Sequence, residues 1–265
     1  MKEEIFVDSF HNLKFSEIKD LEISKNFLPT QNFYKRLYEE IDKRKASSLI
    51  ENKFIQSKIS TGENLFKIIS ELFKDFHNLK ILSSGAGLGI TEKYLAQKGL
   101  EVSAQEFSKS SEFWPDEVKY ISSLDGLKFE SFDLVYEVST LYNFSDKDLE
   151  KYLFKLTSLL KKGGYLIIYE QECRSLLGFF IGSVKSFVLK NINLQKYRFF
   201  TLWGYLRKEK QIKKFLPSNI LPTKSYYFDL DNNWNMRLIK FSPRVFGRQI
   251  FSRKAKSQLH IFKKI

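Results

Sequence analysis

Apolar residues recur at helical spacing through the first 76 residues of the chain. Three of them lie four positions apart and share one face of a helix predicted over residues 32–44: Phe33, Leu37 and Ile41. A second apolar stripe ends at Phe76, and Thr61 is placed to cap the helix that carries it. Residues 1–79 are therefore predicted to form a helical cap over the part of the chain that follows.

From residue 80 to residue 172, short apolar runs alternate with helical patterns. Five strands are predicted, at residues 80–83, 101–106, 118–121, 132–136 and 165–170. A helix over residues 90–98 ends at Gly99, and a second helix carries an apolar stripe from Leu149 to Leu160. Ser145 and Asp148 fit a capping box at its start. Strands that alternate with helices predict βαβ units and a parallel, doubly wound sheet.

The pattern changes after Glu172. Residues 176–189 are apolar and aromatic, and they predict a buried or covering helix, with an interfacial helix on lipid as the alternative. A further helix is predicted over residues 203–216, where Pro217 stops it. Residues 224–228 and 258–263 are predicted to be two strands at the end of the sheet.

Composition excludes several classes of protein. The chain has 265 residues, of which 43% are hydrophobic, enough for a sizeable core. The single cysteine, Cys173, excludes an intramolecular disulfide framework and a multi-cysteine zinc site, and no metal is predicted. No apolar run is long enough to span a membrane. The acidic start, MKEEIFVDSF, disfavours a signal peptide, so the expected location is cytoplasmic.

The net charge of +13 is concentrated in the last third of the chain. Residues 171–265 carry 20 basic and 4 acidic side chains. Such a segment is either a solvated face or a surface for an anionic partner. The anion could be a phosphate-bearing substrate, nucleic acid or an acidic membrane surface.

A glycine-rich turn with an acidic partner is the most informative motif. Gly85, Gly87 and Gly89 lie between the first predicted strand and its helix, and Glu106 ends the next strand. Glycines let a ligand approach the backbone, and a carboxylate can accept both hydrogen bonds of a ribose diol. The dinucleotide fingerprint needs a small residue where this chain has Ile90, so the spacing favours a nucleoside ligand without a pyrophosphate.

Three segments together resemble the class I S-adenosylmethionine-dependent methyltransferases: KILSSGAGLGITEKYLAQKGLEVSAQEFS, SFDLVYEVSTLYNF and LEKYLFKLTSLLKKGGYLIIYEQ. The resemblance covers residues 60–172 and continues more weakly through WGYLRKEKQIKKFL. It implies an α/β fold with a mostly parallel, seven-stranded, Rossmann-like sheet, an antiparallel C-terminal strand pair and an N-terminal helical cover. Residues 80–172 would be the cofactor-binding core. Residues 173–265 would complete the sheet and contribute to the acceptor site.

The resemblance also implies which residues bind S-adenosylmethionine. They would be Ser83, Gly85, Ala86, Gly87, Gly89, Glu106, Phe107, Asp125 and Glu137. In this set Glu106 would hold the ribose hydroxyls, Phe107 would flank the adenine and Asp125 would bind the adenine amino group. Ser83 departs from the family, which usually has an acidic residue there to help hold the amino group of the methionine.

Catalytic candidates are polar residues near the end of the fourth predicted strand, namely Glu137, Tyr142 and Asn143. By the resemblance, Glu137 would face the methyl and substrate region, and a general base there would help an O-methylation. Tyr142 also fits the role of a packing residue, and Asn143 also fits that of a turn residue. Aromatic residues of the first helix fit either core packing or the lining of an acceptor pocket: Phe33, Tyr34 and Tyr38.

The expected function is therefore methyl transfer to an anionic small-molecule or glycan-precursor acceptor (EC 2.1.1.-). One alternative is an RNA- or protein-directed methyltransferase that docks through the basic segment; nucleic acid is not the favoured partner. Another is a non-catalytic binding module that has lost cofactor affinity at Ser83. A nicotinamide-dependent oxidoreductase is disfavoured by Ile90. Peripheral membrane contact through residues 176–189 stays open, as does the oligomeric state.

Overall fold

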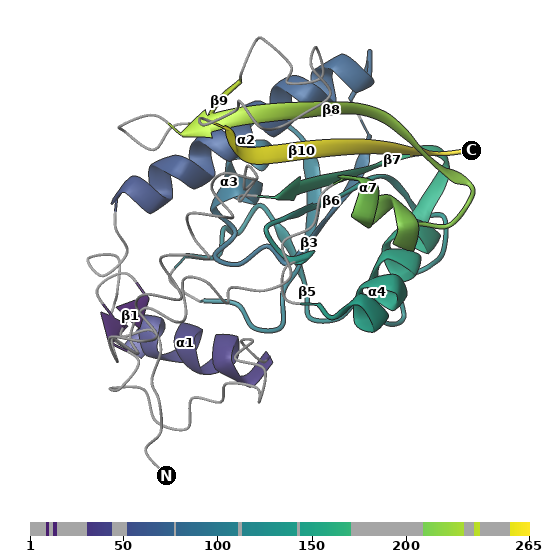
Figure 1. Cartoon of the computed structure of the whole chain (residues 1–265). Coiled ribbons are helices and arrows are strands. Elements are labelled where there is room, and N and C mark those ends of the chain that lie inside the picture. Colours follow the sequence, from purple (N-terminus) through teal and green to yellow (C-terminus); the bar gives the residue numbers. More distant parts are fainter. Residues whose placement is uncertain are drawn as a thin grey trace, which may run out of the picture.

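A mixed β-sheet with helices on both faces is the core of the molecule (Figure 1). The computed structural model describes residues 9–10, 13–14, 31–43, 52–76, 78–110, 113–141, 144–170, 209–230, 236–238 and 255–265. A small hairpin of β1 (Ser9–Phe10) and β2 (Leu13–Lys14) is separate from the main sheet. The predicted helix over residues 176–189 lies outside the described residues.

The strand order of the main sheet is β5-β4-β3-β6-β7-β10-β8-β9. Its parallel part consists of β3 (Lys80–Ser84), β4 (Glu101–Gln105), β5 (Lys119–Ile121), β6 (Phe132–Val138) and β7 (Leu160–Glu170). Its antiparallel part consists of β10 (Ala255–Lys264), β8 (Ile220–Leu230) and β9 (Met236–Leu238). The predicted seven-stranded, mostly parallel sheet with an antiparallel C-terminal pair is confirmed, and β9 adds a three-residue strand at its edge.

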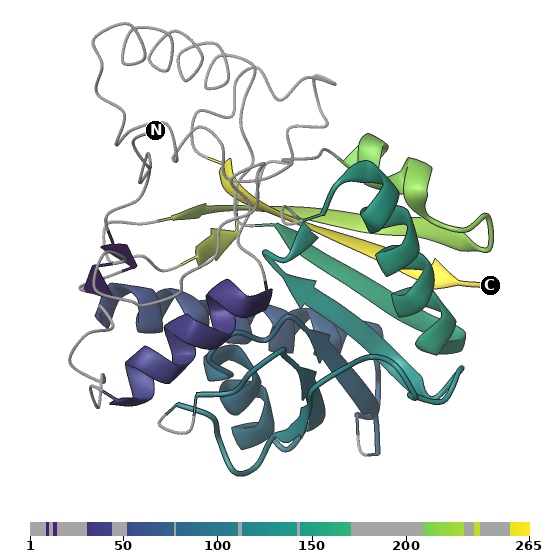
Figure 2. The same cartoon turned by 90° about the horizontal axis from the view of Figure 1, so that it is seen from below.

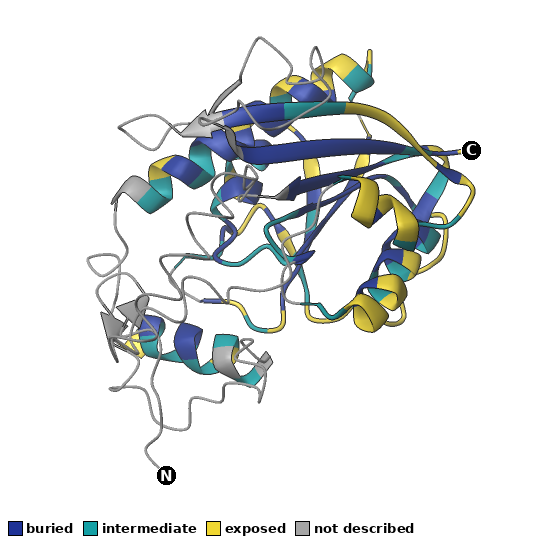
Figure 3. Ribbon diagram, in the orientation of Figure 1, coloured by how far each residue is buried: buried dark blue, intermediate teal, exposed yellow. Residues whose placement is uncertain are grey.

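Helices pack on both faces of this sheet, which makes the fold doubly wound. On one face, α2 (Asn52–Leu72) and α3 (Ile90–Gln97) bury apolar residues against the odd-numbered positions of β3 and the even-numbered positions of β6. On the other face lie α4 (Asp146–Leu159), α7 (Glu209–Ile212) and the short 3-10 helix η5 (Lys213–Phe215). Figure 3 shows the central strands buried between these layers and the outer face of α4 exposed.

A local sequence signal accounts for the start of α4, and a contact from the last strand stabilises its end. Ser145 caps the helix, because its Oγ accepts a hydrogen bond from the Asp148 amide at 3.3 Å. At the other end, the Lys264 ammonium donates to the carbonyls of Leu160 and Thr157, at 2.8 and 3.3 Å. A cation there satisfies carbonyls without a helical partner and opposes the negative end of the helix dipole. The last strand thereby fastens the helix that precedes β7.

The expectation that Thr61 caps a helix is wrong. The helix begins at Asn52, and the Thr61 hydroxyl donates to the Ser57 carbonyl one turn earlier, at 2.9 Å. A serine or threonine inside a helix often makes this bond in place of a cap. The next residue, Gly62, lets α3 approach closely, since a Cβ there would lie 3.0 Å from the Tyr94 ring.

Helix α1 (Gln31–Lys43) lies outside the two helical layers (Figures 1 and 2). Its predicted apolar face is confirmed in part: Leu37 and Ile41 are buried, and Tyr38 beside them is buried too. Within the described ranges, no helix is both long enough and apolar enough to cross a bilayer.

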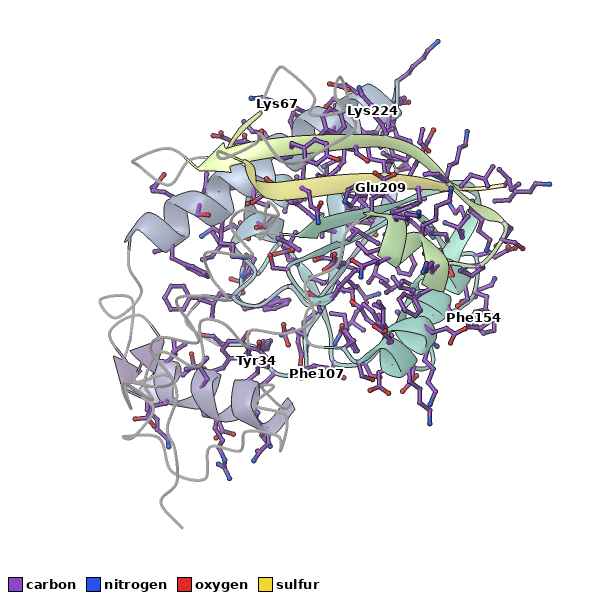
Figure 4. All side chains as sticks on the ribbon, in the orientation of Figure 1. Tyr34, Lys67, Phe107, Phe154, Glu209 and Lys224 are labelled. Carbon is purple, nitrogen blue, oxygen red and sulfur yellow. The ribbon has the colours of Figure 1, made fainter. Side chains whose placement is uncertain are left out.

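The two faces of α4 predict very different responses to truncation. Leu153 is fully buried in the core, whereas the neighbouring Phe154 is 64% exposed and points away from the sheet (Figure 4). We expect Leu153→Ala to lower the free energy of unfolding by about 2–5 kcal/mol, because it removes buried methyl groups and leaves a cavity. Phe154→Ala is the matched control and should change it by about 0.5 kcal/mol or less. Urea unfolding followed by circular dichroism measures both values, and equal losses would contradict the assigned burial.

Candidate cofactor site

The glycine turn lies at the carboxyl edge of the parallel strands, where β3, β4 and β6 end. The amides of Gly85 and Ala86 both donate to the Gln105 carbonyl, at 2.9 and 3.1 Å. These bonds fix the turn to the end of the neighbouring strand. The loops after adjacent parallel strands thus meet at one edge, as ligand sites in open α/β sheets require.

The three glycines of the turn have different surroundings, although all three have positive φ angles. A Cβ on Gly85 would lie 2.8 Å from Thr140 Cγ2, and one on Gly89 would lie 2.9 Å from Pro115 Cδ. The protein itself therefore occupies the space beside these two. At Gly87 the nearest atom is the Tyr38 hydroxyl oxygen, 3.8 Å away. Gly87 is the position in this turn that leaves room for a ligand.

Glu106 joins the glycine turn to the end of β4. Its buried carboxylate accepts hydrogen bonds from the amides of Gly87 and Phe107, each at 2.8 Å. A carboxylate offers about four acceptor positions, so two remain after these bonds. The predicted ribose anchor is therefore held rigidly, with acceptor capacity left for two hydroxyl groups.

Burial raises the pKa of Glu106 to about 7, although the amides of Phe107 and Gly87 act in the opposite direction. The negative charge of Glu92 raises it further. The Tyr120 hydroxyl donates to the Glu106 carbonyl at 2.9 Å and fixes the backbone of the same residue. Glu106 thus stands near its protonation midpoint at neutral pH.

Helix α1 closes over the glycine turn. Tyr38 is buried beside Gly87, and its pKa is raised well above the ordinary value by burial and then by the charge of Glu106. The Ser110 hydroxyl donates to Asp42 and ties the loop after β4 to the end of the helix. Tyr34 stacks obliquely on Tyr38, with ring centroids 6.2 Å apart. The predicted helical cover therefore reaches the cofactor site itself.

Ser83 lies at the end of β3 and is not alone there. Its hydroxyl donates to the Glu92 carboxylate at 2.7 Å, and the Tyr136 hydroxyl donates to the same oxygen at 2.8 Å. Sequence reasoning did not select Glu92. A signal was present, because Glu92 is three residues before the buried Leu95 and so shares its helix face. A charged residue on the buried face of a short helix usually has a specific partner.

Glu137 is fully buried near the end of β6. One of its oxygens accepts a hydrogen bond from the Thr140 amide at 2.8 Å. The intervening Ser139 has φ 57°, a left-handed conformation that a non-glycine residue rarely adopts and that turns the chain back toward the carboxylate. Two other catalytic candidates, Tyr142 and Asn143, lie outside the described residues.

Phe107 and Asp125 have different places in the site. Phe107 is 45% exposed and lies at the same end of the molecule as Tyr34 (Figure 4). The exposed Asp125 instead pairs with Lys155 of α4 at 3.8 Å, and its amide donates to Ser123. The structure therefore joins the glycine turn, Glu106 and Phe107 by hydrogen bonds, and among the described residues no hydrogen bond or ion pair links Asp125 to them. The side chain of Phe33 is not among those described.

A family model for the methyltransferase domain matches residues 82–168. This span begins in β3, ends in β7 and contains the glycine turn, Glu106 and Glu137. This part of the chain is similar to a methyltransferase domain. The resemblance drawn from the sequence is confirmed. No curated protein matches the chain.

Solved structures share the fold of this methyltransferase domain together with its flanking elements. One is an S-adenosylmethionine-dependent methyltransferase of Thermotoga maritima, described as a possible histamine N-methyltransferase. It is 15% identical with a TM-score of 0.56, and the alignment covers 89% of this chain and 100% of that one. Another is magnesium protoporphyrin IX methyltransferase of Synechocystis PCC 6803, with bound S-adenosylhomocysteine. It is 14% identical with a TM-score of 0.53, and the alignment covers 89% of this chain and 97% of that one.

A third similar structure is the Burkholderia thailandensis 1,6-didemethyltoxoflavin-N1-methyltransferase, with bound 1,6-didemethyltoxoflavin and S-adenosylhomocysteine. It is 12% identical, with a TM-score of 0.52 and coverage of 89% of this chain and 91% of that one. At such identities the likeness concerns the fold alone.

The raised pKa of Glu106 predicts a pH-dependent stability. The folded protein holds a proton on this carboxyl between the unfolded pKa of about 4.5 and the folded value of about 7. The free energy of unfolding should therefore fall as pH rises through this window, by about 2–4 kcal/mol in total. Glu106→Gln has no proton to lose at this position, so its free energy of unfolding should not show this fall with pH. Denaturant unfolding of both proteins from pH 5 to pH 8 measures the difference, and parallel curves would contradict it.

Proposed function

We propose that this protein transfers a methyl group from S-adenosylmethionine to a small-molecule acceptor. The observation that carries the proposal is the carboxylate of Glu106, which is bound to the Gly87 amide beside the one open position of the turn. A ribose diol donates two hydrogen bonds, and Glu106 has acceptor positions left for both. The matched methyltransferase domain supports the same cofactor.

The remaining site residues would orient the reactants. S-adenosylmethionine supplies an activated methyl group on its sulfonium, so alignment of the acceptor accounts for much of the rate. Gly87 allows close approach to the backbone, and Phe107 offers a ring to the adenine. Glu137 would hold, or accept a proton from, the acceptor at the end of β6.

The nature of the acceptor rests on different residues. The buried charges of the described site are mostly acidic: Glu92, Glu106 and Glu137. An anionic acceptor would therefore need the basic residues of the segment 171–265, most of which lie outside the described ranges. The likeness to enzymes that are named for small molecules supports a small acceptor. Its anionic character stays a prediction.

Titration calorimetry with S-adenosylhomocysteine tests the cofactor assignment. We expect micromolar binding by the wild-type protein and an affinity about tenfold lower, or weaker still, for Glu106→Gln, a loss of about 1.4 kcal/mol or more. Glu101→Gln changes an exposed carboxylate on the same strand and should bind as the wild type does. The absence of binding by the wild-type protein would overturn the assignment and favour the non-catalytic module.

The same titration should depend on pH. Ribose hydroxyls favour the ionised carboxylate, so the affinity should be about tenfold lower at pH 6 than at pH 8, given a Glu106 pKa of about 7. Binding at pH 6 should release a proton, which titrations in buffers of different ionisation enthalpy detect. Glu106→Gln should lose both effects; if it keeps them, another group is responsible.

A further inference from the structure

Glu92 has acceptor capacity that the described protein does not use. It belongs to the first turn of α3, it is 1% exposed, and Ser83 and Tyr136 both donate to its Oε1. No other described residue donates a hydrogen bond to Oε2. A buried carboxylate is costly unless both its lone pairs and its charge are satisfied. Oε2 is therefore an acceptor that a cationic donor would satisfy.

Lys58 brings a positive charge to the same place from α2. Its carbonyl accepts a hydrogen bond from Thr91 at 3.1 Å, so this turn of α2 lies against the first turn of α3. Burial lowers the pKa of the Lys58 ammonium, while the charges of Glu92 and Glu137 act in the opposite direction. The Lys58 ammonium lies over the Phe54 ring, 5.4 Å from its centroid, and in the described part of the chain no ion pair joins it to Glu92. The opposite charges influence each other without contact.

A carboxylate and an ammonium held near each other, but not paired, suit an α-amino acid group. Such a group carries an ammonium and a carboxylate on one carbon atom, so it can meet both charges at once. Each contact would be a charge-assisted hydrogen bond in a buried setting, the strongest kind that side chains make. The position also fits, because Ser83 is two residues before Gly85 and Glu92 is three residues after Gly89.

We propose that Glu92 and Lys58 bind the amino-acid end of S-adenosylmethionine, Glu92 through the α-ammonium and Lys58 through the α-carboxylate. The inference rests on the proposed function, since it assigns a second part of the same cofactor site. Ser83 and Tyr136 then act as positioning residues, which hold one oxygen of Glu92 and leave the other for the ligand. The acidic group that the resemblance places at Ser83 is supplied instead by α3.

The clamp formed by Glu92 and Lys58 makes a prediction that the ribose site does not. A nucleoside without the amino-acid group, 5′-methylthioadenosine, would contact Glu106 but neither Glu92 nor Lys58. The wild-type protein should therefore prefer S-adenosylhomocysteine, and loss of the clamp should remove that preference. Glu106→Gln should lower the affinity for both ligands to a similar extent.

The test is calorimetric titration of the full chain with both ligands at pH 8. Glu92→Gln keeps an oxygen that can accept from Ser83 and Tyr136, but it removes the charge; Lys58→Met removes the ammonium and keeps an unbranched chain. Each should lower the affinity for S-adenosylhomocysteine about tenfold or more and leave the affinity for 5′-methylthioadenosine nearly unchanged. Glu117→Gln, on the surface, is the control and should change neither affinity. Thermal unfolding without ligand checks that each variant is folded.

The outcomes separate this inference from the function on which it rests. If Glu92→Gln and Lys58→Met both fold and leave the ratio of the two affinities at the wild-type value, the clamp is wrong, whatever Glu106→Gln does. If the wild-type protein binds both ligands with equal affinity and Glu106→Gln lowers both affinities, the cofactor site is supported and the clamp is contradicted. If the wild-type protein binds neither ligand, the proposed function fails and the clamp fails with it.

Discussion

The hydrogen bond between the Glu106 carboxylate and the Gly87 amide joins the two turns on which the site depends. One turn follows β3 and the other follows β4, and the amides of Gly85 and Ala86 add hydrogen bonds to the Gln105 carbonyl at the end of β4. No described cation pairs with the buried Glu106, and two backbone amides supply its donors instead. Helix α1 rests on this pair of turns through Tyr38, and the loop after β4 is tied to α1 through Ser110.

Three buried carboxylates lie around one sheet edge, and their charges shape the chemistry. Burial raises the pKa of both Glu92 and Glu106, and the charge of Glu92 raises that of Glu106 further. Like charges held together in a buried place destabilise the ligand-free protein. A ligand with a positive charge and hydroxyl donors relieves this cost. S-adenosylmethionine has both, through its sulfonium and ammonium and through its ribose.

Local sequence signals were sufficient for much of the fold. The strand before Gly85, the cap at Ser145 and the apolar stripe of α4 could be predicted because each depends on neighbours within a few residues. The start of α2 could not, since Ser57, Thr61 and Gly62 are poor helix formers, and the packing of α2 against α3 and the sheet outweighs their preference. The contact of Ser83 with Glu92 was likewise beyond prediction, because only the packing of α3 on β3 brings the two together.

A crystal structure of the protein grown with saturating S-adenosylhomocysteine tests the central claim most directly. The account predicts both ribose hydroxyls against the Glu106 carboxylate, the sugar beside Gly87, and α1 closed over the ligand. Density for the nucleoside away from Glu106, or a site without ligand at saturating concentration, would contradict it.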